Sequence, residues 1–210
     1  MKFRNREEAA GKLAEALKRF HAHPDTVVLA LPRGGVVLGR IVADTLALPL
    51  DIVVPRKIGA PGNEEYAIGA ITESGDAVWN EAERARTSDS YVAKVVATER
   101  AEAQRRLKTY RSTDEPRDLL GKTVIVVDDG IATGLTMRAA LATIKHEGAA
   151  RSIVAVPVCP SDTKQELSTA VDELIVLQSP ASFGGVGAWY EVFPQVDDET
   201  VITLLRSPPL

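Results

Sequence analysis

The sequence predicts an α/β fold in which helices cover both faces of a mostly parallel central sheet. Segments typical of strands alternate with segments typical of helices, which is the order that βαβ units produce. The strand segments that start near residues 26, 51, 124 and 152 are unbroken runs of valine, isoleucine and leucine. A strand with one face in water would alternate apolar and polar residues, so these runs indicate strands that are buried on both faces.

The first elements follow from capping and turn residues. Residues 5 to 20 place apolar side chains on one face of a helix, and Asn5 is suited to cap its start. Residues 26 to 32 predict a buried strand that a proline ends. A glycine-led turn then opens a helix over residues 33 to 48, and a second buried strand follows at residues 50 to 55.

The middle of the chain changes character. Residues 56 to 72 are rich in glycine, proline and charge, and they predict a long mobile loop that returns as a short strand near Ile68 to Thr72. A helix with a charged outer face is predicted over residues 88 to 111. The later elements are strands at residues 121 to 129, 151 to 159 and 173 to 178, helices at 133 to 149 and 161 to 168, and a terminal helix capped by residues 197 to 200.

Composition and charge exclude several classes of protein. The chain has 210 residues, and we expect one domain over residues 1 to 210 with a core at about 24 to 178. Its net charge of −4 provides no basic field for nucleic acid, and no apolar run has the length of a membrane span or a signal peptide. A cytoplasmic location is the resulting expectation. The single cysteine, Cys159, lies in an apolar stretch that is typical of a buried thiol.

Unusual residues follow three of the predicted strands. They are the stretches LPRGG at residues 31 to 35, PRKIG at 55 to 59, and VDDGIATG at 127 to 134. In a parallel sheet, ligands bind beyond the carboxyl ends of the strands, so we expect these stretches to converge on one site.

The two acids Asp128 and Asp129 emerge where a buried strand ends. Paired carboxylates accept hydrogen bonds from the two hydroxyls of a diol, or hold hydrated Mg²⁺ through water. The alternative is that one acid only caps the following helix, which would explain one acid but not both. In the next segment, residues 130 to 136, a glycine-containing turn opens a helix, and its free amides and two threonines suit a phosphate.

Cations stand at the ends of the two earlier strands. Arg33 with Gly34 and Gly35 forms a turn that suits a diphosphate, although an ordinary helix-start turn explains this stretch equally well when it is taken alone. Arg56 and Lys57 begin the predicted loop, which is long enough to close over a ligand. Together the three stretches specify a ligand with a sugar diol, a phosphate and a diphosphate, which describes phosphoribosyl diphosphate (PRPP).

The motif VIVVDDGIATGLT, residues 124 to 136, resembles the PRPP signature of the type I phosphoribosyltransferases. The resemblance covers about residues 26 to 178 and implies their Rossmann-like fold with a small hood, formed here by about residues 179 to 210 with the helix at 5 to 20. It places the ribose hydroxyls and the water shell of Mg²⁺ at Asp128 and Asp129. It also implies a diphosphate loop with a non-proline cis peptide. The implied PRPP-binding residues are Arg33, Gly34, Gly35, Asp128, Asp129, Gly130, Ala132, Thr133, Gly134, Leu135 and Thr136.

The resemblance implies a reaction, in which a nitrogen heterocycle takes the 5-phosphoribosyl group of PRPP and diphosphate leaves. It implies Mg²⁺ as cofactor and a homodimer. The net charge and the lack of a long apolar run predict no nucleic acid or membrane partner. In this interpretation Asp129, Arg33, Arg56 and Lys57 are catalytic. Glu65, or its neighbour Glu64, is the candidate acid or base in the lid, and solvated loop charge is the alternative for either glutamate.

The sequence departs from parts of the family pattern. Ala132 stands where the hypoxanthine-guanine branch has an acid that acts on the purine, which argues against an oxopurine enzyme of that type. Leu135 replaces a small or basic residue. The aromatic residues Phe183, Trp189 and Tyr190, with Phe193 nearby, are candidates for stacking on the acceptor base, and anchoring of the tail is the alternative.

Two other functions compete with the transferase. A regulatory protein could bind PRPP or nucleotides with the same fold and perform no catalysis. The PRPP synthases share the motif, but this chain is too short for their duplicated domains. The long lid with its two cations favours catalysis.

Overall fold

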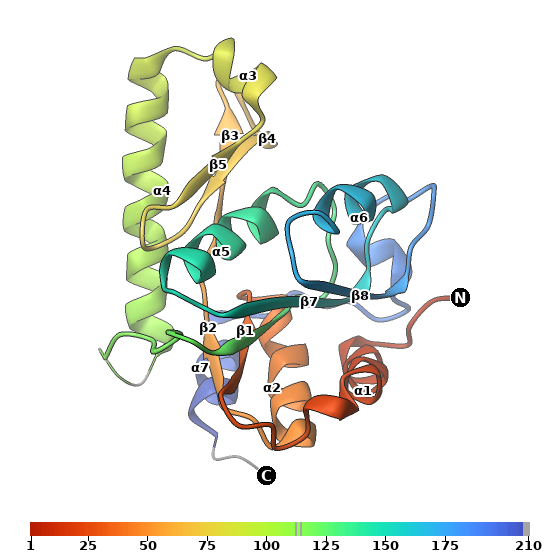
Figure 1. The fold of residues 1–210 in the computed structure, drawn as a ribbon. Helices are drawn as coiled ribbons and strands as arrows, with labels where there is room; N and C mark the ends of the chain where they lie inside the picture. Colours follow the sequence, from red (N-terminus) through yellow and green to blue (C-terminus); the bar gives the residue numbers. More distant parts are fainter. Residues whose placement is uncertain (112, 114, 208–210) are drawn as a thin grey trace.

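A five-stranded parallel sheet forms the centre of the protein (Figure 1), in a computed structural model that describes residues 1–111, 113 and 115–207. Its strands follow the order β2-β1-β6-β7-β8. Their bounds are β1 Thr26–Ala30, β2 Leu50–Ile52, β6 Thr123–Val127, β7 Arg151–Val158 and β8 Glu173–Gln178. The predicted parallel sheet is therefore confirmed, with β1 and β6 in register from Thr26 beside Thr123 to Ala30 beside Val127.

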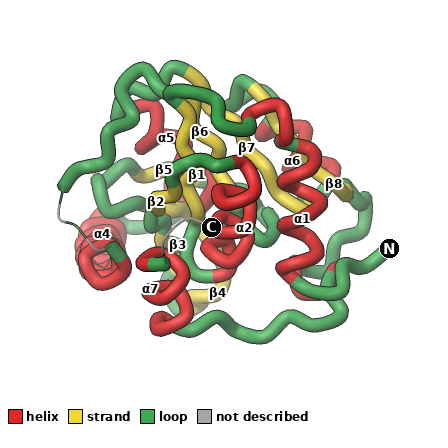
Figure 2. The backbone as a smooth tube through the Cα atoms, turned by 90° about the horizontal axis from the view of Figure 1, so that it is seen from below, coloured by secondary structure: helices red, strands yellow, loops and turns green. Residues whose placement is uncertain are grey.

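Helices cover both faces of this sheet, as the unbroken apolar strands predict. The helices α1 (Arg6–Ala16) and α2 (Gly34–Leu46) pack on the face that Ile125 and Val127 present. On the opposite face, α5 (Leu135–His146) and α6 (Ser161–Leu167) pack on Val124 and Val126. Figure 1 shows the two layers on either side of the sheet, and Figure 2 shows α1 and α2 in front of the strands. Alternate residues of one strand thus enter two different cores.

The segment predicted as a mobile loop is a small antiparallel sheet, so that prediction was wrong. Its strands are β3 Arg56–Ala60, β4 Asn63–Ile71 and β5 Ala77–Trp79, in the order β3-β4-β5. The predicted return strand near Ile68 to Thr72 falls within the end of β4. Ile58, Ile68 and Ile71 are buried against Val95 and Val96 of a later helix, α4 (Asp89–Tyr110), and this packing fixes the hairpin. Glycine and proline between the isoleucines hid the strand pattern.

A long helix supports the hairpin. The helix α4 (Asp89–Tyr110) runs beside β3 and β4, as Figure 1 shows, and the Ser88 side chain caps it by accepting a bond from the Tyr91 amide. The prediction for residues 88 to 111 is thus confirmed. The preceding short helix α3 (Glu81–Ala85) and β5 were not predicted.

The tail returns to the start of the chain. It contains the short helix η2 (Val186–Trp189) and α7 (Asp198–Arg206), whose start Asp197 caps as predicted. The amide of Phe3 donates to the carbonyl oxygen of Trp189, and the carbonyl oxygen of Phe3 accepts from Glu191, both at 2.8 Å. The remaining element, η1 (Lys18–Phe20), extends α1. Among the described residues, no helix combines the length and apolar composition needed to cross a bilayer.

Candidate active site

The acids Asp128 and Asp129 each have one oxygen bound to the protein and one oxygen that no described residue binds. Oδ1 of Asp128 accepts a bond from the amide of Asp129 at 2.8 Å. Oδ2 of Asp129 accepts from Nε of Arg6 at 2.9 Å and lies 2.8 Å from a second nitrogen of that guanidinium. No described residue donates to the other oxygen of either acid. Since no buried polar side-chain atom of the described residues lacks a partner, these two oxygens reach solvent.

The electrostatics of this pair disfavour two negative charges. Burial raises the pKa of Asp128 well above its ordinary value, and the neighbouring charge of Asp129 raises it further. Burial also raises the pKa of Asp129, although Arg6 opposes this shift. Hydroxyl donors or a cation placed at the free oxygens would relieve the unfavourable charge.

The diphosphate loop predicted from the sequence lies directly against the acids. A Cβ atom on Gly35 would lie 2.9 Å from the carbonyl oxygen of Val127 and 3.0 Å from Oδ1 of Asp128. A Cβ atom on Gly34 would lie closer still to Asp129. The preceding peptide bond, Pro32–Arg33, is cis, as the family resemblance implies. The structure therefore brings two of the three predicted stretches together.

The turn after the acids exposes a run of unbonded donors. Within the described residues, no acceptor bonds the amides of residues 132 to 136 or the hydroxyls of Thr133 and Thr136. Gly134, with φ of +77°, caps the 12-residue helix α5, so the amides lie at the positive end of its dipole. Thr163 of α6 fixes the turn by donating to the carbonyl oxygen of Ala132 at 2.9 Å. This arrangement suits a phosphate dianion.

Arg33 points toward the tail. Its guanidinium lies 3.5 Å from Oδ1 of Asp198, an atom that also accepts from the Tyr110 hydroxyl at 2.8 Å. The Arg33 side chain is 38% exposed, so its pairing with Asp198 is weak. Burial and the bond to Asp198 raise the pKa of Tyr110 to about 12.

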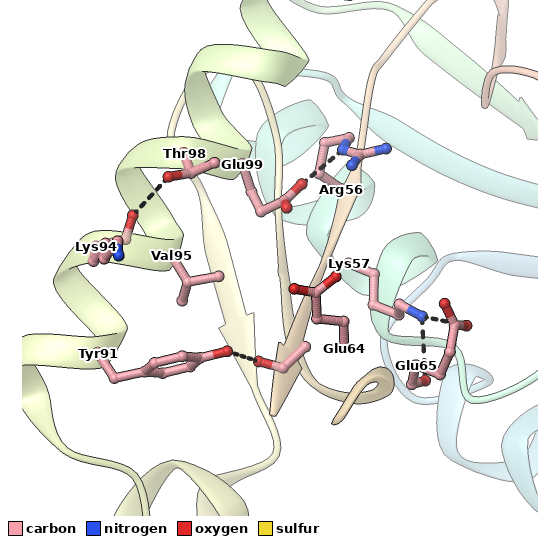
Figure 3. A pocket seen from close by; sticks show the side chains of 10 residues that line it. Arg56, Lys57, Glu64, Glu65, Tyr91, Lys94, Val95, Thr98 and Glu99 are labelled. Carbon is pink, nitrogen blue, oxygen red and sulfur yellow. Dashed lines mark hydrogen bonds and ion pairs between the residues drawn. The ribbon is translucent and has the colours of Figure 1, made fainter. Parts of the chain in front are cut away.

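The third predicted stretch lies in a separate cavity of about 690 Å³ between the hairpin and α4 (Figure 3). Arg56 pairs there with Glu99 of α4 at 2.8 Å, and Lys57 pairs with Glu65 at 3.0 Å. Glu64 also lines this cavity, whereas neither the acids nor residues 132 to 136 do. Arg56 and Lys57, the cations predicted for the lid, thus form ion pairs with carboxylates of α4 and of the hairpin.

The aromatic residues of the tail divide into two groups. Tyr190 is buried between Phe3 and Phe193, at ring distances of 5.6 and 4.8 Å, and its hydroxyl donates to the carbonyl oxygen of Asp129 at 2.6 Å. Its position favours the anchoring alternative. Trp189 and Phe183 are half-buried, and the indole nitrogen of Trp189 donates to the carbonyl oxygen of Phe183 at 3.0 Å. These two remain candidates for contact with an acceptor.

A family model described as the phosphoribosyl transferase domain matches residues 3–187. The chain belongs to this family. It is 41% identical to TT1426 from Thermus thermophilus, whose crystal structure has a TM-score of 0.81 over 98% of both chains. The purine phosphoribosyltransferase from Pyrococcus horikoshii, at 18% identity and a TM-score of 0.50 over 92% of this chain and 93% of its own, shares the fold.

The curated relatives are longer than this chain. A Mycobacterium tuberculosis protein, named only provisionally as phosphoribosyl transferase Rv0571c, is 38% identical over 206 residues. The match covers 97% of this chain and 46% of the relative, so the chain spans about half the length of the curated relatives it matches.

Two residues of this phosphoribosyl transferase domain escaped the sequence prediction. Arg6 contacts Asp129, and Asp198 contacts Arg33. Arg6 lies on the same helix face as Ala9 and Leu13 and is only 7% exposed. A charged residue on an apolar helix face was therefore the available signal, because such a residue needs a buried partner. The sequence around Asp198 indicated only the start of the terminal helix and gave no sign of a contact with Arg33.

Among the described residues, neither a reactive thiol nor an all-protein metal site accompanies this site. Cys159 is fully buried, and burial raises the pKa of its thiol to about 11, which confirms the inert role predicted for it. Within residues 1–111, 113 and 115–207, no three histidine, cysteine, aspartate or glutamate side chains gather as metal ligands.

Proposed function

We propose that this phosphoribosyl transferase domain transfers the 5-phosphoribosyl group of PRPP to a nitrogen heterocycle and releases diphosphate. One observation carries the proposal: two carboxylate oxygens and, directly after them, five amides have no hydrogen-bond partner among the residues that the structure describes. A ribose 5-phosphate has two adjacent hydroxyl donors and a dianion, which is the complementary set.

Each group of residues then has one role. Asp128 and Asp129 accept bonds from the ribose hydroxyls through their free oxygens. The amides and hydroxyls of residues 132 to 136 bind the 5′-phosphate. Arg33, Gly34 and Gly35 bind the diphosphate, because a guanidinium forms paired bonds with phosphate oxygens and glycine lets the backbone approach.

The free oxygens of Asp128 and Asp129 fit a Mg²⁺ ion that would take most of its ligands from the substrate. Mg²⁺ takes oxygen ligands and is commonly held by one or two carboxylates with phosphates and water, and the pair Asp128 and Asp129 offers two free oxygens. When bound, Mg²⁺ would neutralise charge on the departing diphosphate. Arg33 would add positive charge beside that group, and the hairpin, once closed over the ligand, would exclude water.

The roles proposed for the hairpin require movement. Arg56 and Lys57 would stabilise the leaving diphosphate, and Glu65 would transfer a proton with the acceptor, after the hairpin closes over the ligand. Their pairs with Glu99 and within the hairpin would have to open first. Half-buried Phe183 and Trp189 are proposed to contact the acceptor, which Ala132 indicates is not an oxopurine of the hypoxanthine type.

Calorimetric titration with PRPP, with and without Mg²⁺, tests the binding step, and diphosphate release across purines, pyrimidines and related heterocycles tests the transfer. We expect tight binding that EDTA weakens, and release with at least one acceptor. Absence of PRPP binding would refute the proposal. Sedimentation at the same concentrations tests the proposed homodimer.

A second function, a PRPP-binding regulator without catalysis, is favoured by one observation. The lid cations are paired with Glu99 and Glu65 and share no cavity with the acids. Tight PRPP binding with no diphosphate release on any acceptor would support this second function over the first.

A further inference from the structure

Arg6 joins the first helix to the acid pair. Although it lies 123 residues before Asp129 in sequence, two of its nitrogens bind one oxygen, Oδ2, at 2.9 and 2.8 Å. The two side chains are 8% and 14% exposed. Oδ1 of Asp129 keeps no protein donor among the described residues, so the contact fixes the carboxylate without blocking it.

The tail holds Arg6 in turn. The third guanidinium nitrogen of Arg6 donates to the carbonyl oxygen of Pro194 at 2.7 Å, and the guanidinium lies 3.7 Å from the centre of the Phe193 ring. Tyr190, which stacks on Phe193, donates to the backbone of Asp129. The tail therefore holds Asp129 twice, once through its backbone and once through Arg6.

We infer that Arg6 is a positioning residue for PRPP, an inference that rests on the proposed function. Gly34 and Arg6 both lie against Oδ2, so the carboxylate has one orientation, with Oδ1 toward solvent. All three guanidinium nitrogens of Arg6 are bound to oxygens of Asp129 and Pro194, so Arg6 acts through Asp129. A lysine has one nitrogen and lacks the planar fork that joins Asp129 to Pro194.

The test compares three variants at matched protein concentrations. Arg6→Gln removes the charge and Arg6→Lys keeps it. Lys18→Ala, which removes an exposed pair with Glu15 just after the same helix, is the control. Calorimetry measures two probes, PRPP with Mg²⁺ and inorganic phosphate alone, because residues 132 to 136 bind phosphate without Arg6. Thermal unfolding verifies that each variant is folded at the assay temperature.

We expect Arg6→Gln to weaken PRPP binding about tenfold to a hundredfold and to leave phosphate binding within about twofold. Arg6→Lys should restore part of the PRPP affinity, and Lys18→Ala should match the wild type. Unchanged PRPP affinity in Arg6→Gln, or an equal loss for both probes, would show a purely structural role.

Two further results separate the possibilities. If Arg6→Gln does not fold, Arg6→Lys carries the test, and an affinity for PRPP equal to that of the wild type would overturn the inference. A wild-type protein that binds no PRPP would instead overturn the proposed function, and the inference with it.

Discussion

A side-chain carbon on Gly34 would lie 1.9 Å from Oδ2 of Asp129. Real Cβ atoms do not approach an oxygen so closely, so the predicted diphosphate loop meets the acid pair only because residue 34 has no side chain. The same side-chain carbon on Gly34 would lie 3.2 Å from Nε of Arg6. One missing carbon thus lets three segments of the chain meet.

Gly34→Ala should therefore displace Asp129 and disturb its contact with Arg6. We expect a loss of stability of about 1–3 kcal/mol, typical of overpacking, and a loss of PRPP binding. Urea unfolding and calorimetry measure the two effects. Gly11→Ala is the matched control, because a Cβ atom there meets nothing within 4 Å. A Gly34→Ala protein with the wild-type stability and affinity would contradict the described packing.

Asp129→Ala should abolish PRPP binding and leave the fold intact. It removes the free oxygen that we assign to a ribose hydroxyl, and it leaves the Arg6 charge without its partner. Calorimetry and circular dichroism provide the two measurements. Unchanged PRPP affinity in this variant would count heavily against the assignment of the site.

Asp128→Asn should stabilise the ligand-free protein at neutral pH by about 1 kcal/mol, as replacements of strained functional groups often do. A carboxyl whose pKa is raised in the folded state binds its proton more tightly there than in the unfolded chain. The buried carboxyl therefore does not lower the free energy of unfolding at a pH below its ordinary pKa. Above that pH it lowers the free energy of unfolding increasingly, until the pH reaches the raised pKa. Melting temperatures of both proteins between pH 3 and pH 8 should diverge as the pH increases, and parallel curves would refute this.

Asp198→Asn should strengthen PRPP binding. The Asp198 carboxylate pairs with Arg33 at 3.5 Å and would therefore compete with the diphosphate that we propose for Arg33. An exposed pair contributes at most about 1 kcal/mol, so the expected gain is no more than about fivefold. Glu199→Gln removes the same charge from the same helix turn without touching Arg33 and serves as control. Equal changes in both variants would indicate a general charge effect.

Arg117→Leu should destabilise the fold by about 3–5 kcal/mol. The side chains of Arg117 and Glu73 are each 5% exposed, and Arg117 also pairs with Glu147, which follows α5. Removing the cation leaves a carboxylate buried without its partner. Urea unfolding measures the change, and Lys122→Ala, which breaks an exposed pair with Asp118, should change stability by less than about 1 kcal/mol.

The sequence predicted the strands and helices whose pattern of apolar residues matches the faces that they bury. The parallel strands and their helices follow from continuous apolar runs, and each strand of the central sheet was found near its expected position. The hairpin could not be predicted from pattern alone, because its core consists of three isoleucines that only meet on folding against Val95 and Val96 of α4. Its apolar residues alternate too irregularly to show a strand period.

Contacts between distant segments also limited the prediction of the site. The acids and the turn are contiguous in sequence, and the glycine loop is a short local stretch, so their chemistry was recognisable. The pairs of Arg6 with Asp129 and of Arg33 with Asp198 join residues 123 and 165 positions apart. No local pattern encodes such a partner. The anchoring of Tyr190 depended in the same way on Phe3, near the opposite end of the chain.

The contacts of Tyr190 and Pro194 with the centre of the site have a consequence for synthesis on the ribosome. A nascent chain that has emerged only as far as α6 already contains the acids and the phosphate turn, yet it lacks the groups that hold Asp129 and Arg6 in place. Such a partial chain should hold Asp129 and Arg6 poorly, so the proposed ligand site is complete only after residue 194 has left the exit tunnel.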